Sequence, residues 1–90
     1  MKKVKVLIKG KVHGVFFRDN VKKLALKLGL KGYVMNVPNG VEAVFVGTED
    51  KVNEMLDFCL KGPSGAKVTG MDIATYSGSD FESFEIVYSE

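Results

Sequence analysis

Cysteine and histidine are nearly missing from this sequence. Each occurs once in 90 residues, as Cys59 and His13. A single cysteine excludes an intrachain disulfide, and one cysteine with one histidine cannot supply a metal-binding set. Cys59 stands among apolar residues of an expected helix, where a buried and inert thiol is the usual state. We therefore expect no metal ion and no cofactor.

Long apolar runs are missing as well. The first ten residues combine basic side chains with a short apolar stretch, but Lys5 and Lys9 interrupt that stretch. The segment is therefore neither a signal peptide nor a membrane span. A cytoplasmic location without a membrane partner is the expectation that follows.

The sequence also carries little net charge. Thirteen Lys and Arg residues oppose 11 Asp and Glu residues, which gives a formal charge of +2. This charge is too small to indicate a nucleic-acid partner by itself. The first third is nevertheless basic, with Lys2, Lys3, Lys5, Lys9, Lys11, Arg18, Lys22, Lys23, Lys27 and Lys31 against Asp19 alone. These residues could steer an anionic ligand toward that end of the molecule, or could simply form a solvated face.

What the sequence does contain is enough apolar material for one core. Apolar residues make up 46% of the chain and charged residues 27%. These fractions are ordinary for a soluble domain and argue against disorder. Because so short a chain cannot build a second core, we expect a single domain over residues 1–90.

Two segments repeat apolar residues at the helical spacing i, i+3, i+4 and i+7. The sets are Val21, Leu24, Ala25 and Leu28 in the first segment, and Val52, Met55, Leu56 and Cys59 in the second. Gly29 suits the left-handed position after a helix, so the first helix is predicted from residue 18 or 19 to residue 28. Thr48 offers an N-cap for the second helix, and Lys61, Gly62 and Pro63 offer its end.

The other segments show the patterns of strands. Residues 3–9 alternate between apolar and mostly basic side chains, and the apolar runs 32–37 and 41–46 flank Asn39-Gly40, which favours a hairpin turn. Residues 67–76 predict a fourth strand. The alternation of Phe84, Ile86 and Tyr88 predicts a short fifth strand.

The resulting order is βαββαβ with a further C-terminal strand. Right-handed crossovers place both helices on one face of an antiparallel sheet, which is the α+β, ferredoxin-like two-layer sandwich. In that topology the first and third strands are central neighbours, and the second strand pairs with the third.

A glycine-punctuated segment between the first strand and the first helix is the first candidate site. It reads Gly10-Lys-Val-His-Gly-Val-Phe-Phe-Arg18. Such a loop lets the backbone turn tightly and points several N–H groups at one spot, an arrangement that binds anions. The guanidinium of Arg18 could hold two phosphate oxygens at once. An ordinary turn with a surface arginine would show the same spacing.

Asn36 is the second candidate. It interrupts an apolar run although Asn39-Gly40 already supplies the turn, and asparagine is poorly suited to strands. Its amide offers the donor and the acceptor that positioning a water molecule requires. The alternative is an asparagine that bonds to local backbone at the end of a strand. The topology allows Asn36 and the loop to converge at one edge of the molecule.

The segment from Gly10 to Arg18 resembles the acylphosphatase signature, Gly-x-Val-Gln-Gly-Val-x-Phe-Arg. The segment Gly32-Tyr-Val-Met-Asn36, followed three residues later by Gly40, resembles the second signature of that family. Further similarities lie at Leu28-Gly-Leu, at Gly62-Pro with Ala66 and Val68, and at Phe84-Glu-Ile-Val-Tyr88. The resemblance covers nearly the whole chain.

The resemblance implies a ferredoxin-like enzyme that hydrolyses the carboxyl–phosphate anhydride of acyl phosphates without a metal. Arg18 matches the phosphate-binding arginine of the family, and Asn36 matches its water-orienting asparagine. The backbone cradle that binds the substrate corresponds to His13, Gly14, Val15, Phe16 and Phe17. The implied partners are a small-molecule acyl phosphate and inorganic phosphate, and we expect a monomer.

The chain departs from the family pattern at two places. His13 replaces the more usual glutamine, which makes it an alternative general base. Against that role, the family normally carries a residue there that does not titrate. The stretch 40–47 is one residue shorter than is typical, which leaves the register of the third strand open.

Two other functions compete with this interpretation. One is a non-enzymatic ferredoxin-like module that binds RNA or a protein, but RNA readers display aromatic residues on central strands, and residues 3–9 contain none. The other is a regulatory domain that handles carbamoyl phosphate within a larger enzyme. The self-contained length favours the separate enzyme.

Overall fold

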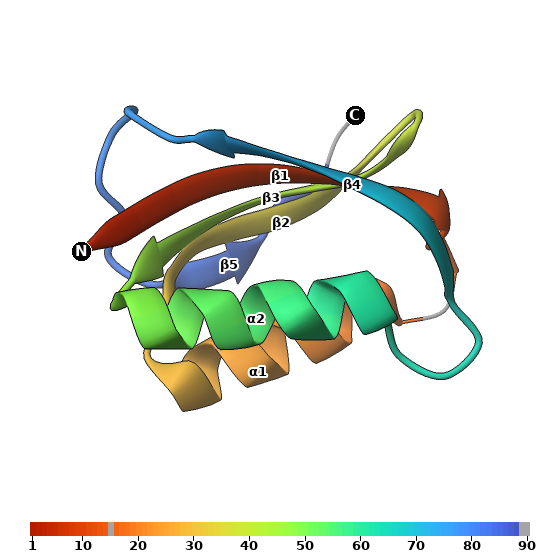
Figure 1. The fold of residues 1–90 in the computed structure, drawn as a ribbon, viewed down its shortest axis with the longest axis horizontal. Helices are drawn as coiled ribbons and strands as arrows, with labels where there is room; N and C mark the ends of the chain where they lie inside the picture. The colour runs from red at the N-terminus through yellow and green to blue at the C-terminus, as the bar shows by residue number, and fades with distance from the viewer. Residues whose placement is uncertain (15, 89–90) are drawn as a thin grey trace.

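The structure is a computed structural model that describes residues 1–14 and 16–88. Within these ranges the chain forms a two-layer sandwich with both helices on one face of a sheet (Figure 1). The elements are β1 (Lys2–Lys11), α1 (Phe17–Leu28), β2 (Lys31–Val37), β3 (Gly40–Gly47), α2 (Glu49–Lys61), β4 (Lys67–Thr75) and β5 (Phe84–Ile86). The strand order is β4-β1-β3-β2-β5. The ferredoxin-like fold expected from the sequence is confirmed.

β1 and β3 form the centre of the sheet, as the topology requires. They pair antiparallel, with Val6 opposite Ala43 and Ile8 opposite Val41. All four side chains are buried on the face that the helices cover. β2 pairs with β3 with Val37 opposite Gly40, which settles the register that the sequence left open.

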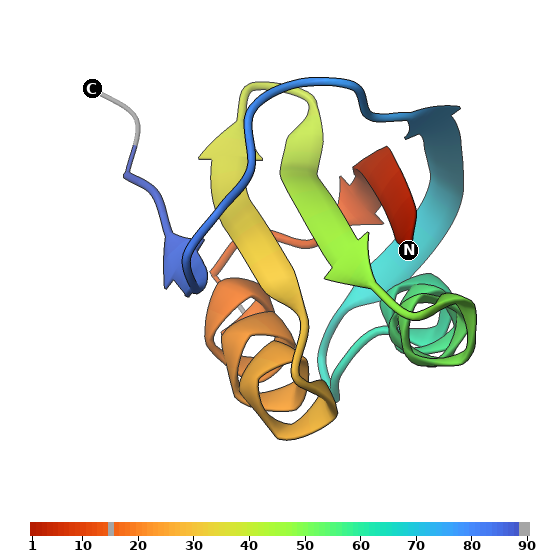
Figure 2. The ribbon, with the colours of Figure 1, turned by 90° about the vertical axis from the view of Figure 1, so that its left-hand side faces the viewer.

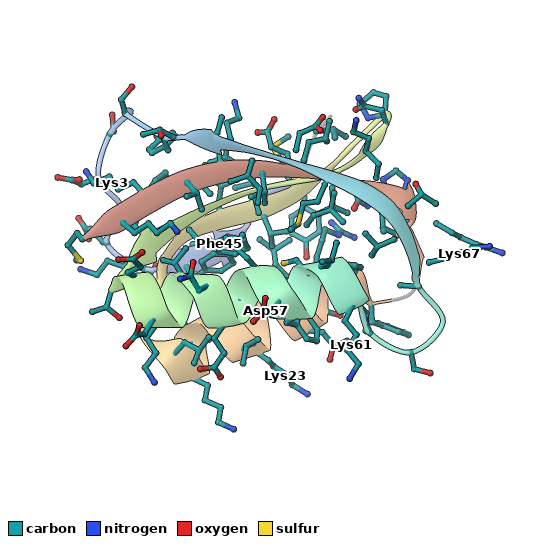
Figure 3. The ribbon with its side chains drawn as sticks, in the orientation of Figure 1. Lys3, Lys23, Phe45, Asp57, Lys61 and Lys67 are labelled. Carbon is teal, nitrogen blue, oxygen red and sulfur yellow. The ribbon has the colours of Figure 1, made fainter. Side chains whose placement is uncertain are left out.

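The helices turn the predicted stripes toward the core, where Leu24, Leu28 and Leu56 are partly buried and the other members are fully buried. α1 buries Phe17, Val21 and Ala25, and α2 buries Val52, Met55 and Cys59. Figure 3 shows Phe45 of β3 between the sheet and the helices, where its ring stacks on that of Phe84 at 5.6 Å. Full burial of a large apolar side chain stabilises the fold by about 1.5–3 kcal/mol. The buried apolar side chains between the helices and the sheet therefore hold these two layers together.

The ends of α1 follow from local chemistry. The helix begins at Phe17, one residue before the expected start, and ends at Leu28 as expected. Gly29 adopts φ 72°, and the N–H of Leu30 donates to the carbonyl of Ala25 at 2.9 Å. This is the glycine-terminated helix end that the sequence predicts.

β5 corrects one part of the expected topology. The first four strands are antiparallel, but β5 runs parallel to β2, with Ile86 opposite Val34. The sheet is therefore mixed, and the expectation of an antiparallel sheet is wrong for this strand. The physical reason is the connection after β4, which crosses to the far edge before β5 begins, as Figure 2 shows. β5 also ends at Ile86, so Tyr88 lies beyond the strand that was expected to contain it.

Aromatic contacts and an ion pair hold that crossing connection. Phe81 packs against Tyr33 and Tyr76, with ring centroids 5.8 and 5.7 Å apart. The Nζ of Lys3 lies 2.8 Å from the Oδ1 of Asp80. This pair keeps the pKa of Asp80 below its ordinary value, chiefly through the hydrogen bond from Lys3. The connection is thus fixed to β1 and β2, which brings β5 to the edge of the sheet beside β2.

Candidate functional site

The loop between β1 and α1 turns sharply at two described residues. Gly14 has φ 71°, and Phe16 has φ 57° and ψ 28°. Phe16 is the one described residue other than glycine with a positive φ. Its carbonyl accepts hydrogen bonds from the backbone N–H and the side-chain Nδ2 of Asn20, at 3.1 and 2.9 Å. A left-handed residue of this kind costs of order 1–3 kcal/mol and is found mainly at functional sites.

This loop opens directly into the first turn of α1. The first N–H groups of a helix have no partner within it, and the helix dipole places partial positive charge there. No side chain caps this end of α1. The junction between the loop and the helix can therefore bind an anion through main-chain donors.

A concavity of about 330 Å³ lies at the junction. Its lining residues are Val12, Gly14, Phe16, Phe17, Arg18, Asp19, Asn36 and Tyr88. It brings together Arg18 and Asn36, which the sequence singled out separately. Three of the expected cradle residues, Gly14, Phe16 and Phe17, line it as well.

The sheet register explains the position of Asn36. Asn36 pairs with Val41 of β3, and Val41 pairs with Ile8 of β1. Directly opposite residues share a face of a sheet, and Val41 and Ile8 are fully buried beneath the helices. Asn36 therefore belongs to the helix-facing side of β2, close to the start of α1.

The other two predicted cradle residues are His13 and Val15. The Nε2 of His13 lies 2.6 Å from the carbonyl oxygen of Gly40, so its side chain contacts the β2–β3 hairpin. His13 is not one of the residues that line the concavity. Val15 lies outside the described residues, and its predicted role is untested.

The concavity includes two residues that the sequence analysis did not place there. Asp19 contributes an exposed carboxylate from the first turn of α1. Tyr88, a residue that is 72% exposed, contributes a ring whose centroid lies 5.2 Å from the Cζ of Arg18. The alternation of Phe84, Ile86 and Tyr88 could have indicated the orientation of Tyr88, but the direction of β5 was needed to place it beside Arg18.

A second hollow, of about 360 Å³, lies on the side of the sheet away from the helices. It contains the carboxylates of Glu42 and Asp72. The hydroxyl of Tyr33 donates to the Oε2 of Glu42 at 2.7 Å. The pKa of Tyr33 is raised, first by burial and then by Glu42. Lys5 lines this hollow as well, and its Nζ lies 3.9 Å from the Oε1 of Glu42, so the cation of the hollow already faces a carboxylate.

Cys59 behaves as the sequence indicates. Its side chain is fully buried, and burial raises the pKa of its thiol to about 12. A thiol in this state is neither a nucleophile nor a ready metal ligand. Among residues 1–14 and 16–88, no three His, Cys, Asp or Glu side chains are arranged to hold a metal ion. In the same ranges, no helix is long and apolar enough to cross a membrane.

Comparisons with known proteins agree with the fold. The acylphosphatase family model matches residues 4–86. An acylphosphatase of Syntrophus aciditrophicus is 50% identical over 93 aligned residues, which cover 100% of this chain and 96% of that protein. The crystal structure of the acylphosphatase from Bacillus subtilis superposes with a TM-score of 0.90 at 31% identity, over 98% of this chain and 100% of that one.

The same fold also occurs inside a longer protein. Full-length HypF, solved in a phosphate- and nucleotide-bound form, superposes with a TM-score of 0.89 at 27% identity. The match covers 96% of this chain and 12% of that one. Two signatures in order, the fold and the relatives lead to one conclusion: this chain belongs to the acylphosphatase family.

Proposed function

We propose that the chain hydrolyses acyl phosphates at the concavity between the β1–α1 loop and Asn36. Arg18 and backbone N–H groups of the loop hold the phosphate group of the substrate, and Asn36 holds the attacking water molecule. The observation that carries this proposal is the convergence of Arg18 and Asn36 on one concavity from two different elements.

Phosphate binding follows from the chemistry of the loop. The N–H groups at the start of α1 and the guanidinium of Arg18 donate to the phosphate oxygens. The planar guanidinium can donate two parallel hydrogen bonds and keeps its charge at any physiological pH. These donors also follow the oxygens as charge moves onto them during the reaction, which is where preorganised donors have their largest effect.

The attack on phosphorus needs orientation more than a strong base. The side-chain amide of Asn36 does not titrate, but it can hold a water molecule by one donor and one acceptor. The oxygen of that water forms a bond to phosphorus while the bond from phosphorus to the acyl oxygen breaks. The acyl group leaves with the electron pair as a carboxylate, and an oxygen of the phosphate takes the proton. Because a carboxylate is a good leaving group, positioning and charge stabilisation supply most of the catalysis.

In this mechanism the positive charge comes from Arg18, so no metal is required. We also propose that the enzyme acts as a cytoplasmic monomer without a nucleic-acid partner. The small net charge supports the absence of nucleic acid, and the single, fully buried cysteine is compatible with a reducing compartment.

The direct experiment is hydrolysis of benzoyl phosphate with and without EDTA, with inorganic phosphate as the competitor. We expect turnover that EDTA does not change and that phosphate inhibits competitively. EDTA-sensitive turnover, or no turnover, would overturn the proposal.

A further inference from the structure

Tyr88 lines the concavity together with Arg18. The N–H of Val87 donates to the carbonyl of Val34 at 2.9 Å, so the pairing with β2 continues past the end of β5. Ile86 is opposite Val34 in a parallel register, which puts Tyr88 level with Asn36, two residues further along each strand. The backbone before Tyr88 is therefore held at the site by pairing with β2.

The ring of Tyr88 contacts the guanidinium of Arg18 at the concavity. Its centroid is 5.2 Å from the Cζ of Arg18, within the range of a cation–π interaction. The guanidinium must keep one plane if two of its N–H groups are to reach two oxygens of one phosphate. A cation–π contact with the Tyr88 ring uses no hydrogen-bond acceptor, so it does not replace the phosphate oxygens as acceptors for the N–H groups of Arg18.

From this geometry we infer that Tyr88 is a positioning residue, which holds the guanidinium of Arg18 in the plane that grips the phosphate. The inference rests on the proposed function, since it assigns Arg18 to phosphate binding. The ring is sufficient for this role, and the phenolic hydroxyl is not required. The aromatic side chain acts through Arg18 and does not itself touch the reacting atoms.

The kinetic test compares two variants and two substrates. Tyr88→Leu removes the ring, and we expect kcat/KM to fall about fivefold for acetyl phosphate and for benzoyl phosphate alike, the factor that corresponds to a cation–π contact of ~1 kcal/mol. Tyr88→Phe keeps the ring and should restore the rate with both substrates. Because 72% of the side chain is exposed, both variants should fold. A fall confined to benzoyl phosphate would mean that the ring contacts the acyl group and would overturn the inference, as would a Tyr88→Phe variant as impaired as Tyr88→Leu.

A spectroscopic test separates this inference from the proposed function. The Nε–H resonance of Arg18, identified by its loss in Arg18→Lys, should be shifted by the ring current of Tyr88 in ¹⁵N-labelled protein. The shift should persist in Tyr88→Phe and disappear in Tyr88→Leu. If the protein hydrolyses no acyl phosphate, the proposed function fails, but this shift still decides whether the ring holds Arg18. An Arg18 resonance that does not move in Tyr88→Leu would overturn the inference.

Discussion

The two helices of this protein begin in opposite ways. α2 starts after Thr48, whose backbone is extended with φ −67° and ψ 153°, and its first turn carries Glu49 and Asp50. α1 starts after Phe16, whose backbone is left-handed, and its first turn contains Arg18 and one acidic residue, Asp19. Neither start has a side-chain capping hydrogen bond.

This difference shows how one physical feature serves two purposes. Both helices place partial positive charge at their N-terminus. In α2, two carboxylates of the chain itself meet that charge, so the helix end contributes to stability. In α1, the helix start follows a left-handed residue, and a concavity lined by Arg18 lies beside it. Under the proposed function, this arrangement gives up backbone stability for a site where an external anion binds main-chain donors and the guanidinium.

The largest expected effect comes from Arg18, the cation at the α1 start. Arg18→Lys keeps the charge but loses the bidentate geometry, so kcat/KM should fall by about 10²–10³, nearly as far as in Arg18→Ala. Lys51→Ala removes a cation from the first turn of α2 and should leave the rate unchanged. Steady-state kinetics with benzoyl phosphate measure kcat/KM for all three variants. Substantial activity in Arg18→Lys would contradict a bidentate role.

Asn36 should show a different kinetic pattern. Loss of water orientation in Asn36→Ala should lower kcat by about 10²-fold, since misplacement of a reacting group has effects of this size. The inhibition constant of inorganic phosphate should change little, because the proposed phosphate donors lie in the loop and at the start of α1. Asn53→Ala on α2 serves as the matched control. A parallel loss of turnover and phosphate affinity would assign Asn36 to binding instead.

Phe16 tests whether the α1 start is strained. Phe16→Gly removes the strain of a left-handed backbone at an exposed residue, which stabilises the folded state. Glycine also increases the conformational entropy of the unfolded chain, and the first effect offsets the second. We expect the free energy of unfolding to stay level or rise by up to about 1 kcal/mol. Phosphate affinity should fall because the loop is less preorganised. Thr48→Gly, the same change at the α2 start, has no strain to relieve and should lower stability. Urea denaturation of both variants gives the comparison, and a clear loss of stability in Phe16→Gly would refute the strain.

The smallest effect should come from the carboxylates at the start of α2. The double variant with Glu49→Gln and Asp50→Asn should lower the free energy of unfolding by about 0.3–1 kcal/mol per charge at low salt, and less at high salt. Its kcat/KM should equal that of the parent. Glu54→Gln, in the middle of the helix, is the control for loss of charge alone. A change in activity without a change in stability would contradict the assignment of this helix end to stability.

Much of the fold was predictable because local patterns and global topology agree. The apolar stripes at Val21 and Val52, the Asn39-Gly40 turn and the alternation of the first strand each predict an element that the structure contains. The direction of β5 was not predictable in this way. A three-residue edge strand carries no signal of its own orientation, which depends on where the crossing connection places it.

The candidate site was predictable to a similar extent. Arg18 and Asn36 carry residue-type signals, and the strand order brings them to one edge of the molecule. Tyr88 carried only an alternation signal, because its contact with Arg18 depends on the parallel pairing of β5. The side chain of His13 was also not placed by the sequence, since its bond to Gly40 depends on the position of the hairpin.

The difference between the two helix starts can be measured in one experiment. Inorganic phosphate is titrated into ¹⁵N-labelled protein while the backbone amides and the Arg18 side chain are followed by NMR. We expect saturable shifts at the amides of the loop before α1 and at the Nε–H of Arg18, with no shift at residues 48–51 at the start of α2. Shifts of equal size at both helix starts, or none at Arg18, would contradict this expectation.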